Sequence, residues 1–270
     1  MKHALPANDR ISVTVDPQGV AHVRLTRADK LNALDTAMFA ALIEVGQALF
    51  DHRPLRAVVL SGDGRAFCAG LDLAAMAGLL DSDAPPLTER TYGNANLYQQ
   101  VALQWRKMPV PVIAAVHGVC FGGGLQIAGG ADIRVVAPDA RLAVMEMKWG
   151  IVPDMGGFAL WRGIVRADVL RELTYTNREF SGEEAQALGF ATIVDANPLA
   201  RAMAIAAQVA ARSPHAVRSA KTLFNRAADL PLDEILQAES LEQHKLIGSR
   251  NQLEAMQSQQ ERRAADFVDP

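Results

Sequence analysis

The sequence predicts an α/β fold in which a layered core with parallel strands is followed by a helical C-terminal region. Over residues 1–197, short apolar runs typical of strands alternate with segments of helical periodicity. Over residues 198–270, helix-like stretches follow one another with only Ser-Pro, Leu-Pro and Gly-Ser breaks between them. A chain of 270 residues can bury a substantial core, so we expect these two parts to be the α/β core and the helical region.

The first predicted elements are a β-hairpin and a helix. Apolar residues alternate over 11–15 and again over 20–25, and a turn sequence at 16–19 separates the two runs. From 35 to 50 the apolar residues recur at helical spacing, and Asp35 suits the N-cap position of that helix.

Three further apolar runs are typical of buried strands, and a helix that ends near Arg106 precedes the second of them. Loop composition, with acidic residues and two adjacent prolines, is clearest over 74–86. The strands are expected at 57–60, 112–116 and 133–136, and the C-terminal helices at 198–211, 215–228, 232–247 and 250–263.

The composition argues against several classes of protein. Half of the residues are apolar and the formal net charge is −3, which gives no general attraction to nucleic acid or anionic lipid. Cys68 and Cys120 form neither a disulfide framework nor a metal-binding CxxC pair, and we expect no metal site. The first residues lack the apolar stretch of a signal peptide, so a cytoplasmic location is expected.

The segment 110–131 carries no formally charged residue and is long enough to span a bilayer. It contains Pro111 and six glycines, however, which break a helix and leave backbone groups that lipid cannot satisfy. A buried strand, a turn and a second element explain the segment better than a membrane span.

Glycine-rich turns are candidates for binding an anion. Residues 62–64 follow a strand, but Phe67 stands where a dinucleotide fingerprint needs its third glycine. Gly118 and Gly123 have P-loop spacing without the Lys-Ser/Thr that must follow. The triplet 122–124 remains, after a strand and opening a helix, where free N–H groups suit negative charge developing on an oxygen. A tight turn without a ligand is the alternative.

Several segments, in the same order, resemble the enoyl-CoA hydratase/isomerase (crotonase) superfamily. The resemblance implies a repeated ββα core and a C-terminal helical region that packs in homotrimers or homohexamers. It also implies an acyl-CoA thioester substrate and no cofactor, because coenzyme A is part of the substrate. The segments are Asn32-Ala33-Leu34 after Arg27, Phe67 to Leu73, Ala114 to Gly118 leading into 122–124, Ala131 to Arg134, Val152 to Gly157, Ser181 to Ala185 before Leu188-Gly189, and Glu261-Arg262-Arg263 with Phe267.

The resemblance also implies an oxyanion hole and a coenzyme A channel. The backbone N–H groups of Leu71 and Gly123 would bind the thioester carbonyl, and Ala69 would line the adenine side of the channel. Lys30 or Arg27 would meet the phosphates; a solvated loop lysine is the alternative for Lys30. Two such donors stabilise an enolate, and the loss of one typically costs about 2.7–4 kcal/mol of transition-state stabilisation.

The candidate carboxylates differ from those of a hydratase of this family, which places two glutamates on either side of a water. Glu146 occupies the second position, but Gln126 stands at the first, and an amide cannot shuttle a proton at neutral pH. Gln126 is expected to hold a water or a substrate oxygen, or to pack beside the site. For Glu146 the alternative to catalysis is a surface or salt-bridged carboxylate.

Asp154 offers a different second carboxylate, at a position where dienoyl-CoA isomerases of the family use an aspartate as a proton carrier. The alternative is a helix N-cap, because a helix is expected to follow. Glu146 with Asp154 therefore indicates an enoyl- or dienoyl-CoA isomerase that moves a proton along the acyl chain.

Three other functions remain open at this stage. An enoyl-CoA hydratase would use Glu146 alone, with Gln126 orienting the water. A non-catalytic acyl-CoA binder would have lost one hydratase carboxylate. RNA binding, known for one branch of the superfamily, is disfavoured because the Lys and Arg residues are dispersed and the net charge is negative.

Overall fold

The computed structural model describes residue 6 and residues 8–74 and 86–270. The expected loop at 74–86 therefore lies almost entirely outside the described residues. The predicted β-hairpin is confirmed, because β1 (Ile11–Val15) pairs antiparallel with β2 (Val20–Leu25). The predicted N-cap is confirmed as well: the Asp35 carboxylate accepts a hydrogen bond from the Met38 N–H at the start of α1 (Thr36–Phe50).

A six-stranded sheet forms the centre of the molecule, and every pairing in it is parallel except that of β1 with β2. The three predicted buried strands are all present. The strand predicted at 57–60 continues to Gly62 because Ser61 and Gly62 still pair with β2. The strand order is β1, β2, β3 (Ala57–Gly62), β5 (Val112–Val116), β7 (Ile133–Val136) and β10 (Ile193–Val194).

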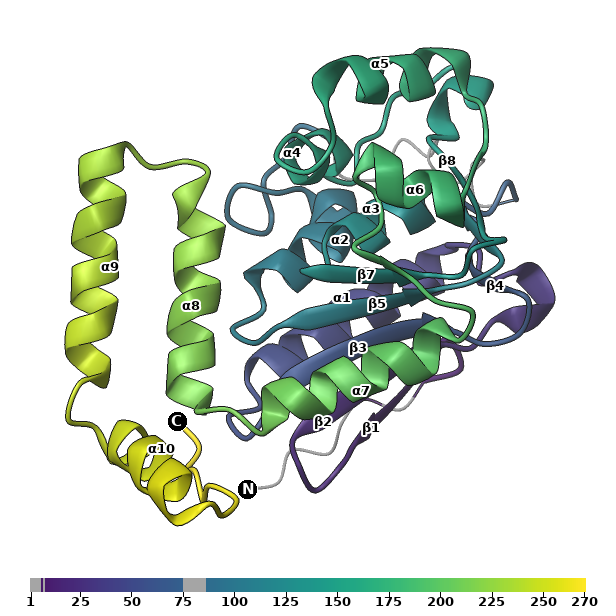
Figure 1. Ribbon diagram of the computed structural model, residues 1–270. Helices are drawn as coiled ribbons and strands as arrows, with labels where there is room; N and C mark the ends of the chain where they lie inside the picture. The colour runs from purple at the N-terminus through teal and green to yellow at the C-terminus, as the bar shows by residue number, and fades with distance from the viewer. Residues whose placement is uncertain (1–5, 7, 75–85) are drawn as a thin grey trace.

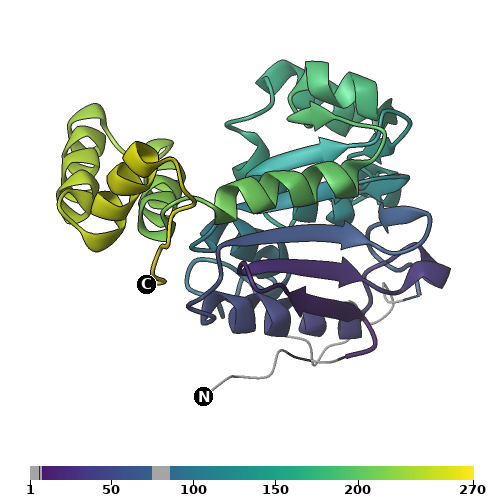
Figure 2. The same cartoon turned by 60° about the horizontal axis from the view of Figure 1, so that its bottom comes forward.

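Both faces of the sheet are buried at β3 and β5, which explains why these two strands are mainly continuous apolar runs. Val58 and Leu60 face the main core with α1 and α2 (Leu97–Lys107), whereas Ala57 and Val59 face α7 (Pro198–Ala210). Figure 2 shows α7 lying along its face of the sheet. The helix approaches closely because its contact residues are small: Ala202, Ala206 and Ala210.

A second sheet of four short strands brings two glycine turns together. Strands β4 and β6 run parallel and side by side, and each leads directly into a turn, at Gly70 and at Gly122. The N–H groups of both turns therefore lie at the same edge. The sheet consists of β4 (Ala66–Cys68), β6 (Val119–Phe121), β8 (Arg141–Ala143) and β9 (Phe180–Ser181).

Short helices surround this second sheet. The helix α3 begins immediately after the β6 turn, and the 3₁₀ helix η3 follows β8 (Figure 1). The elements are η1 (Ala28–Lys30), α3 (Gly123–Gly129), η3 (Glu146–Trp149), α4 (Gly157–Trp161), α5 (Ala167–Thr176) and α6 (Gly182–Leu188).

The C-terminal helices are all present where the sequence predicts them. The first of them, α7, packs on the large sheet, whereas the next three extend away from the sheets (Figures 1 and 2). An ion pair between the buried Lys221 and the more exposed Asp132 joins this outer helical group to the core. The division into parts at residue 198 stays a prediction, and the packing places α7 with the sheet. The outer helices are α8 (Pro214–Ala227), α9 (Leu232–Leu246) and α10 (Arg250–Glu261).

Neither a membrane-spanning helix nor a metal site is found in the described residues. No helix there combines the length and the apolar character that crossing a bilayer needs. No group of three or more His, Cys, Asp or Glu side chains in that part of the chain could hold a metal ion.

Candidate active site

A cavity of about 510 Å³ opens where the two glycine turns meet η3. This volume is in the range of small-molecule sites. Five of the residues that the sequence analysis singled out line the cavity together, although they come from four separate parts of the chain. They are Lys30, Ala69, Leu71, Gly123 and Glu146.

The backbone N–H groups of Leu71 and Gly123 lie in the cavity wall, and neither has a hydrogen-bond partner among the described residues. The Leu34 N–H donates to the Gly70 carbonyl, and the Leu34 carbonyl accepts from the Asp72 N–H. The Leu71 N–H between these two residues takes no part in this bridge. Gly123 is the first residue of α3, where an N–H has no partner within the helix. The two turns touch, since a Cβ at Gly70 would lie 3.4 Å from the Gly123 nitrogen.

Glu146 supplies a buried carboxylate beside these donors. Its side chain is only 7% exposed, and its Oε1 accepts a hydrogen bond of 2.6 Å from Nε2 of Gln126. Oε2 is buried and has no partner among the described residues, and no ion pair to Glu146 is formed there. The alternative of a surface or salt-bridged carboxylate is therefore wrong. Burial raises the pKa of Glu146, against the opposing effect of its hydrogen bonds.

The side-chain amide of Gln126 makes its hydrogen bonds to other residues of the protein. It lies on α3 and is 1% exposed, and its Oε1 accepts from the N–H groups of Met155 at 2.8 Å and Gly157 at 2.9 Å. With the bond to Glu146, its amide makes three hydrogen bonds to other residues. Direct contact with substrate or water stays a prediction, whereas the observed contacts match the alternative of an amide packed beside the site.

Asp154 is half-buried and does not cap the following helix. The N-cap of α4 is Gly156, at φ +87°, and it makes no side-chain cap bond, so the predicted capping role of Asp154 is wrong. The Asp154 carboxylate instead accepts from Nδ2 of Asn96 at 3.2 Å and Nε2 of Gln99 at 2.7 Å. Asp154 is not among the described residues that line the cavity.

The two partners of Asp154 were missed by the sequence analysis. Asn96 and Gln99 form the capping box that begins α2. The Asn-x-x-Gln spacing before an apolar periodic run is a recognisable start signal for a helix. That signal would have located the helix start, although not the contact with a residue 55 positions further along.

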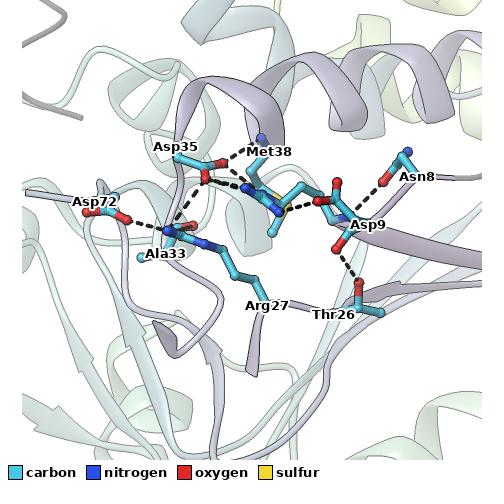
Figure 3. A network of polar contacts seen from close by, with 9 residues as sticks. Asn8, Asp9, Thr26, Arg27, Ala33, Asp35, Met38 and Asp72 are labelled. Atoms are coloured by element: carbon cyan, nitrogen blue, oxygen red, sulfur yellow. Dashed lines mark hydrogen bonds and ion pairs between the residues drawn. The ribbon is translucent and has the colours of Figure 1, made fainter. Parts of the chain in front are cut away.

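Arg27 lies in a network of carboxylates rather than in the cavity (Figure 3). Its guanidinium donates to the Asp72 carboxylate at 2.6 Å and to the Ala33 carbonyl at 3.1 Å, and it lies 3.5 Å from Asp35. The bond from Arg27 lowers the pKa of Asp72. The guanidinium of Arg27 is thus engaged by protein groups, one of which, Asp72, directly follows Leu71. Contact with a phosphate stays a prediction, and the observed placement favours Lys30 for it.

Substituting Arg27→Gln is expected to lower kcat by about 10-fold to 10²-fold and to change KM for the acyl-CoA ester less than about threefold. Asp72 is anchored by Arg27 and follows Leu71 directly, and small displacements of a catalytic donor have effects of this size. Steady-state kinetics of the variant, with Lys30→Met as the comparison expected to raise KM, checks the prediction. A raised KM at constant kcat for Arg27→Gln would mean that Arg27 binds the phosphates instead.

Known proteins are similar to this chain over most of its length. A family model described as enoyl-CoA hydratase/isomerase matches residues 16–270. A mitochondrial Delta(3,5)-Delta(2,4)-dienoyl-CoA isomerase of Mus musculus is 31% identical over 263 residues, covering 94% of this chain and 80% of that protein. A Bacillus subtilis protein named as an enoyl-CoA hydratase/isomerase is 31% identical, with 96% and 98% covered.

Solved structures are similar over nearly the whole chain. An enoyl-CoA hydratase from Bacillus anthracis superposes with a TM-score of 0.86 at 28% identity, covering 96% of this chain and 98% of that one. A structure from Streptomyces coelicolor A3(2), also titled as an enoyl-CoA hydratase, gives 0.86 at 29% identity, with 99% and 98% covered. The α/β fold with its C-terminal helices is thereby confirmed.

Proposed function

The chain belongs to the enoyl-CoA hydratase/isomerase family, and from this membership we propose that it is an isomerase that moves a double bond along an enoyl- or dienoyl-CoA chain. The observation that carries the proposal is the buried carboxylate of Glu146: it lines the same cavity as the N–H groups of Leu71 and Gly123, and one of its oxygens has no partner among the described residues. An amide, Gln126, occupies the place of a second hydratase carboxylate. The mammalian relatives named as dienoyl-CoA isomerases support the same reaction.

In the proposed reaction the thioester oxygen accepts hydrogen bonds from the N–H groups of Leu71 and Gly123. Glu146 then removes a proton from the carbon next to the carbonyl, and the resulting negative charge is stabilised on that oxygen. The electron pair delocalises along the conjugated chain, and a proton returns at a more distant carbon, from Glu146 or from Asp154. In the second case Glu146 releases its proton to solvent and Asp154 takes one up before the next turnover. The proton count of the substrate is unchanged, so the reaction needs no resident cofactor or metal.

Two other residues are proposed to place the coenzyme A moiety. Lys30 lines the cavity and carries a charge suited to a phosphate, and Ala69 lies next to the oxyanion turn.

The exposed apolar side chains of the outer helices support assembly into a homotrimer or homohexamer, as expected for the family: Phe224 is 78%, Leu232 71% and Ile247 67% exposed.

Hydration is the second candidate function, because the similar solved structures are titled as enoyl-CoA hydratases. It would use Glu146 alone to activate a water. A ¹H NMR time course in D₂O with crotonyl-CoA, trans-3-hexenoyl-CoA and a 3,5-dienoyl-CoA separates the two reactions. Double-bond migration with deuterium incorporation supports the isomerase. Rapid 3-hydroxyacyl-CoA formation would establish the hydratase, and binding without turnover of any ester would indicate a non-catalytic binder.

If Asp154 delivers the second proton, Asp154→Asn is expected to lower dienoyl-CoA turnover by at least about 10²-fold, because an amide cannot deliver it. Turnover near the wild-type rate would mean that Glu146 returns the proton itself. Exchange of the α-proton into D₂O should persist in this variant, since Glu146 performs that step. The same NMR time course measures both rates. Equal loss of exchange and turnover would mean that Asp154 acts on the fold of the site and not as a proton carrier.

A further inference from the structure

The orientation of the Gln126 amide is fixed by its surroundings. Its oxygen faces two N–H donors, those of Met155 and Gly157, and its nitrogen faces the Glu146 carboxylate. The reverse orientation would set NH₂ against two N–H groups and oxygen against a carboxylate, so it would lose all three bonds. Gly157 permits this close approach, because a Cβ there would lie 2.9 Å from Oε1 of Gln126.

The bond from Gln126 also fixes which oxygen of Glu146 is available. Oε1 is engaged by Gln126 and packs against Gly122, where a Cβ would lie 3.3 Å from it. Oε2 is left without a partner among the described residues. The next residue in the chain is Gly123, so the engaged side of the carboxylate lies beside the proposed oxyanion donor.

We propose that Gln126 is a positioning residue: its amide holds Glu146 in one orientation and ties it to the loop that carries Asp154 and Met155. This inference rests on the proposed function of Glu146 as the base. The link joins three elements, α3, η3 and the loop before α4, through one buried side chain. A substrate that displaced the loop would therefore also move the Glu146 carboxylate, through the Gln126 amide.

The link also explains why an amide rather than a carboxylate occupies position 126. A glutamate there would keep the two bonds from the loop but would bring a second carboxyl group to about 2.6 Å from Glu146. Two carboxyl groups this close share one proton, and the pair gives up that proton only at raised pH. Gln126 therefore leaves Glu146 without a second carboxyl group against it, so that its proton is not shared.

Several other charged groups lie in or near the cavity. Within the described residues, none of them forms an ion pair with Glu146. Asp154 lies on the adjacent loop, outside the cavity lining. The charged residues that line the cavity besides Glu146 are Lys148, on η3 itself, and Lys30, Asp72, Arg141 and Glu179.

The test compares Gln126→Glu and Gln126→Met with a matched control, Gln104→Met. Gln104 is also a buried amide, but it donates to the carbonyls of Leu42 and Val101 and lies outside the cavity. A ¹³C NMR titration of the Glu146 carboxyl, identified by the signal that Glu146→Gln lacks, needs no turnover. The pH profile of kcat/KM for any ester that reacts is the second readout.

Gln126→Glu is expected to raise the titration midpoint of Glu146 by about 2 pH units, and Gln126→Met by about 1 unit because the bond to the charged form is lost. The acid limb of kcat/KM should move with it, kcat should fall about 10-fold, and KM should change less than threefold. Gln104→Met should alter only the melting temperature.

Unchanged midpoints in both folded Gln126 variants would overturn the inference. Gln126→Glu keeps the acceptor for the loop N–H groups, so it remains informative if Gln126→Met does not fold. If the wild-type protein turns over none of the esters, the proposed function fails, but the titration still decides whether Gln126 controls Glu146.

Discussion

Replacing Glu146 by glutamine is expected to lower kcat for double-bond migration by about 10²–10⁴-fold, with binding of the acyl-CoA ester nearly unchanged. Glutamine has the shape of glutamate and can still accept the bond from Gln126, but it cannot take up the α-proton. Single-turnover kinetics gives the loss of rate, and calorimetric titration with a saturated acyl-CoA gives the affinity. Full activity of the variant would remove Glu146 from the mechanism of isomerisation and of hydration alike.

The same variant is expected to be at least as stable as the wild type at neutral pH. Burial raises the pKa of Glu146 in the folded state, so the folded protein holds this proton more tightly than the unfolded chain does. Stability is therefore lost as pH rises from the ordinary glutamate pKa to the raised one, and the full cost remains above it. Glu146→Gln removes that cost, so its melting temperature should match the wild type near pH 4 and equal or exceed it near pH 8.

Five of the six strands of the large sheet could be predicted from the sequence because each of them is marked locally; the two-residue strand β10 was missed. Strand β5 is a continuous apolar run because both of its faces are covered, and β5 and β7 lie at the predicted residues. The second sheet could not be predicted in this way. Its strands β4, β6 and β9 have two or three residues, which is too short for any period to appear.

The candidate site could likewise be predicted only in part. The resemblance to a family placed Leu71, Gly123 and Glu146 together, and all three line one cavity. The contacts of Arg27 and Asp154 could not be inferred, since their partners lie 45 and 55 residues away and depend on how loops pack. The bonds of Gln126 depend likewise on the loop that Gly157 brings close to it.

Replacing Gly70 by alanine is expected to lower kcat/KM by about 10²–10³-fold, the usual cost of losing one oxyanion donor. Gly70 has φ +86°, and a Cβ there would lie 2.7 Å from the Phe121 carbonyl oxygen and 3.4 Å from the Gly123 nitrogen. The methyl group would therefore push apart the two turns that hold the N–H donors of Leu71 and Gly123.

Gly93→Ala is the matched control for this variant. Gly93 also has positive φ, at +70°, but a Cβ there would meet none of the described residues within 4 Å. Both variants carry the left-handed backbone cost of about 1–2 kcal/mol, whereas only Gly70→Ala disturbs the donors. Thermal melts should therefore show a loss of stability in both proteins, and steady-state assays should show Gly93→Ala within about threefold of the wild type. Equal activities of the two variants would mean that the paired turns do not form the oxyanion hole.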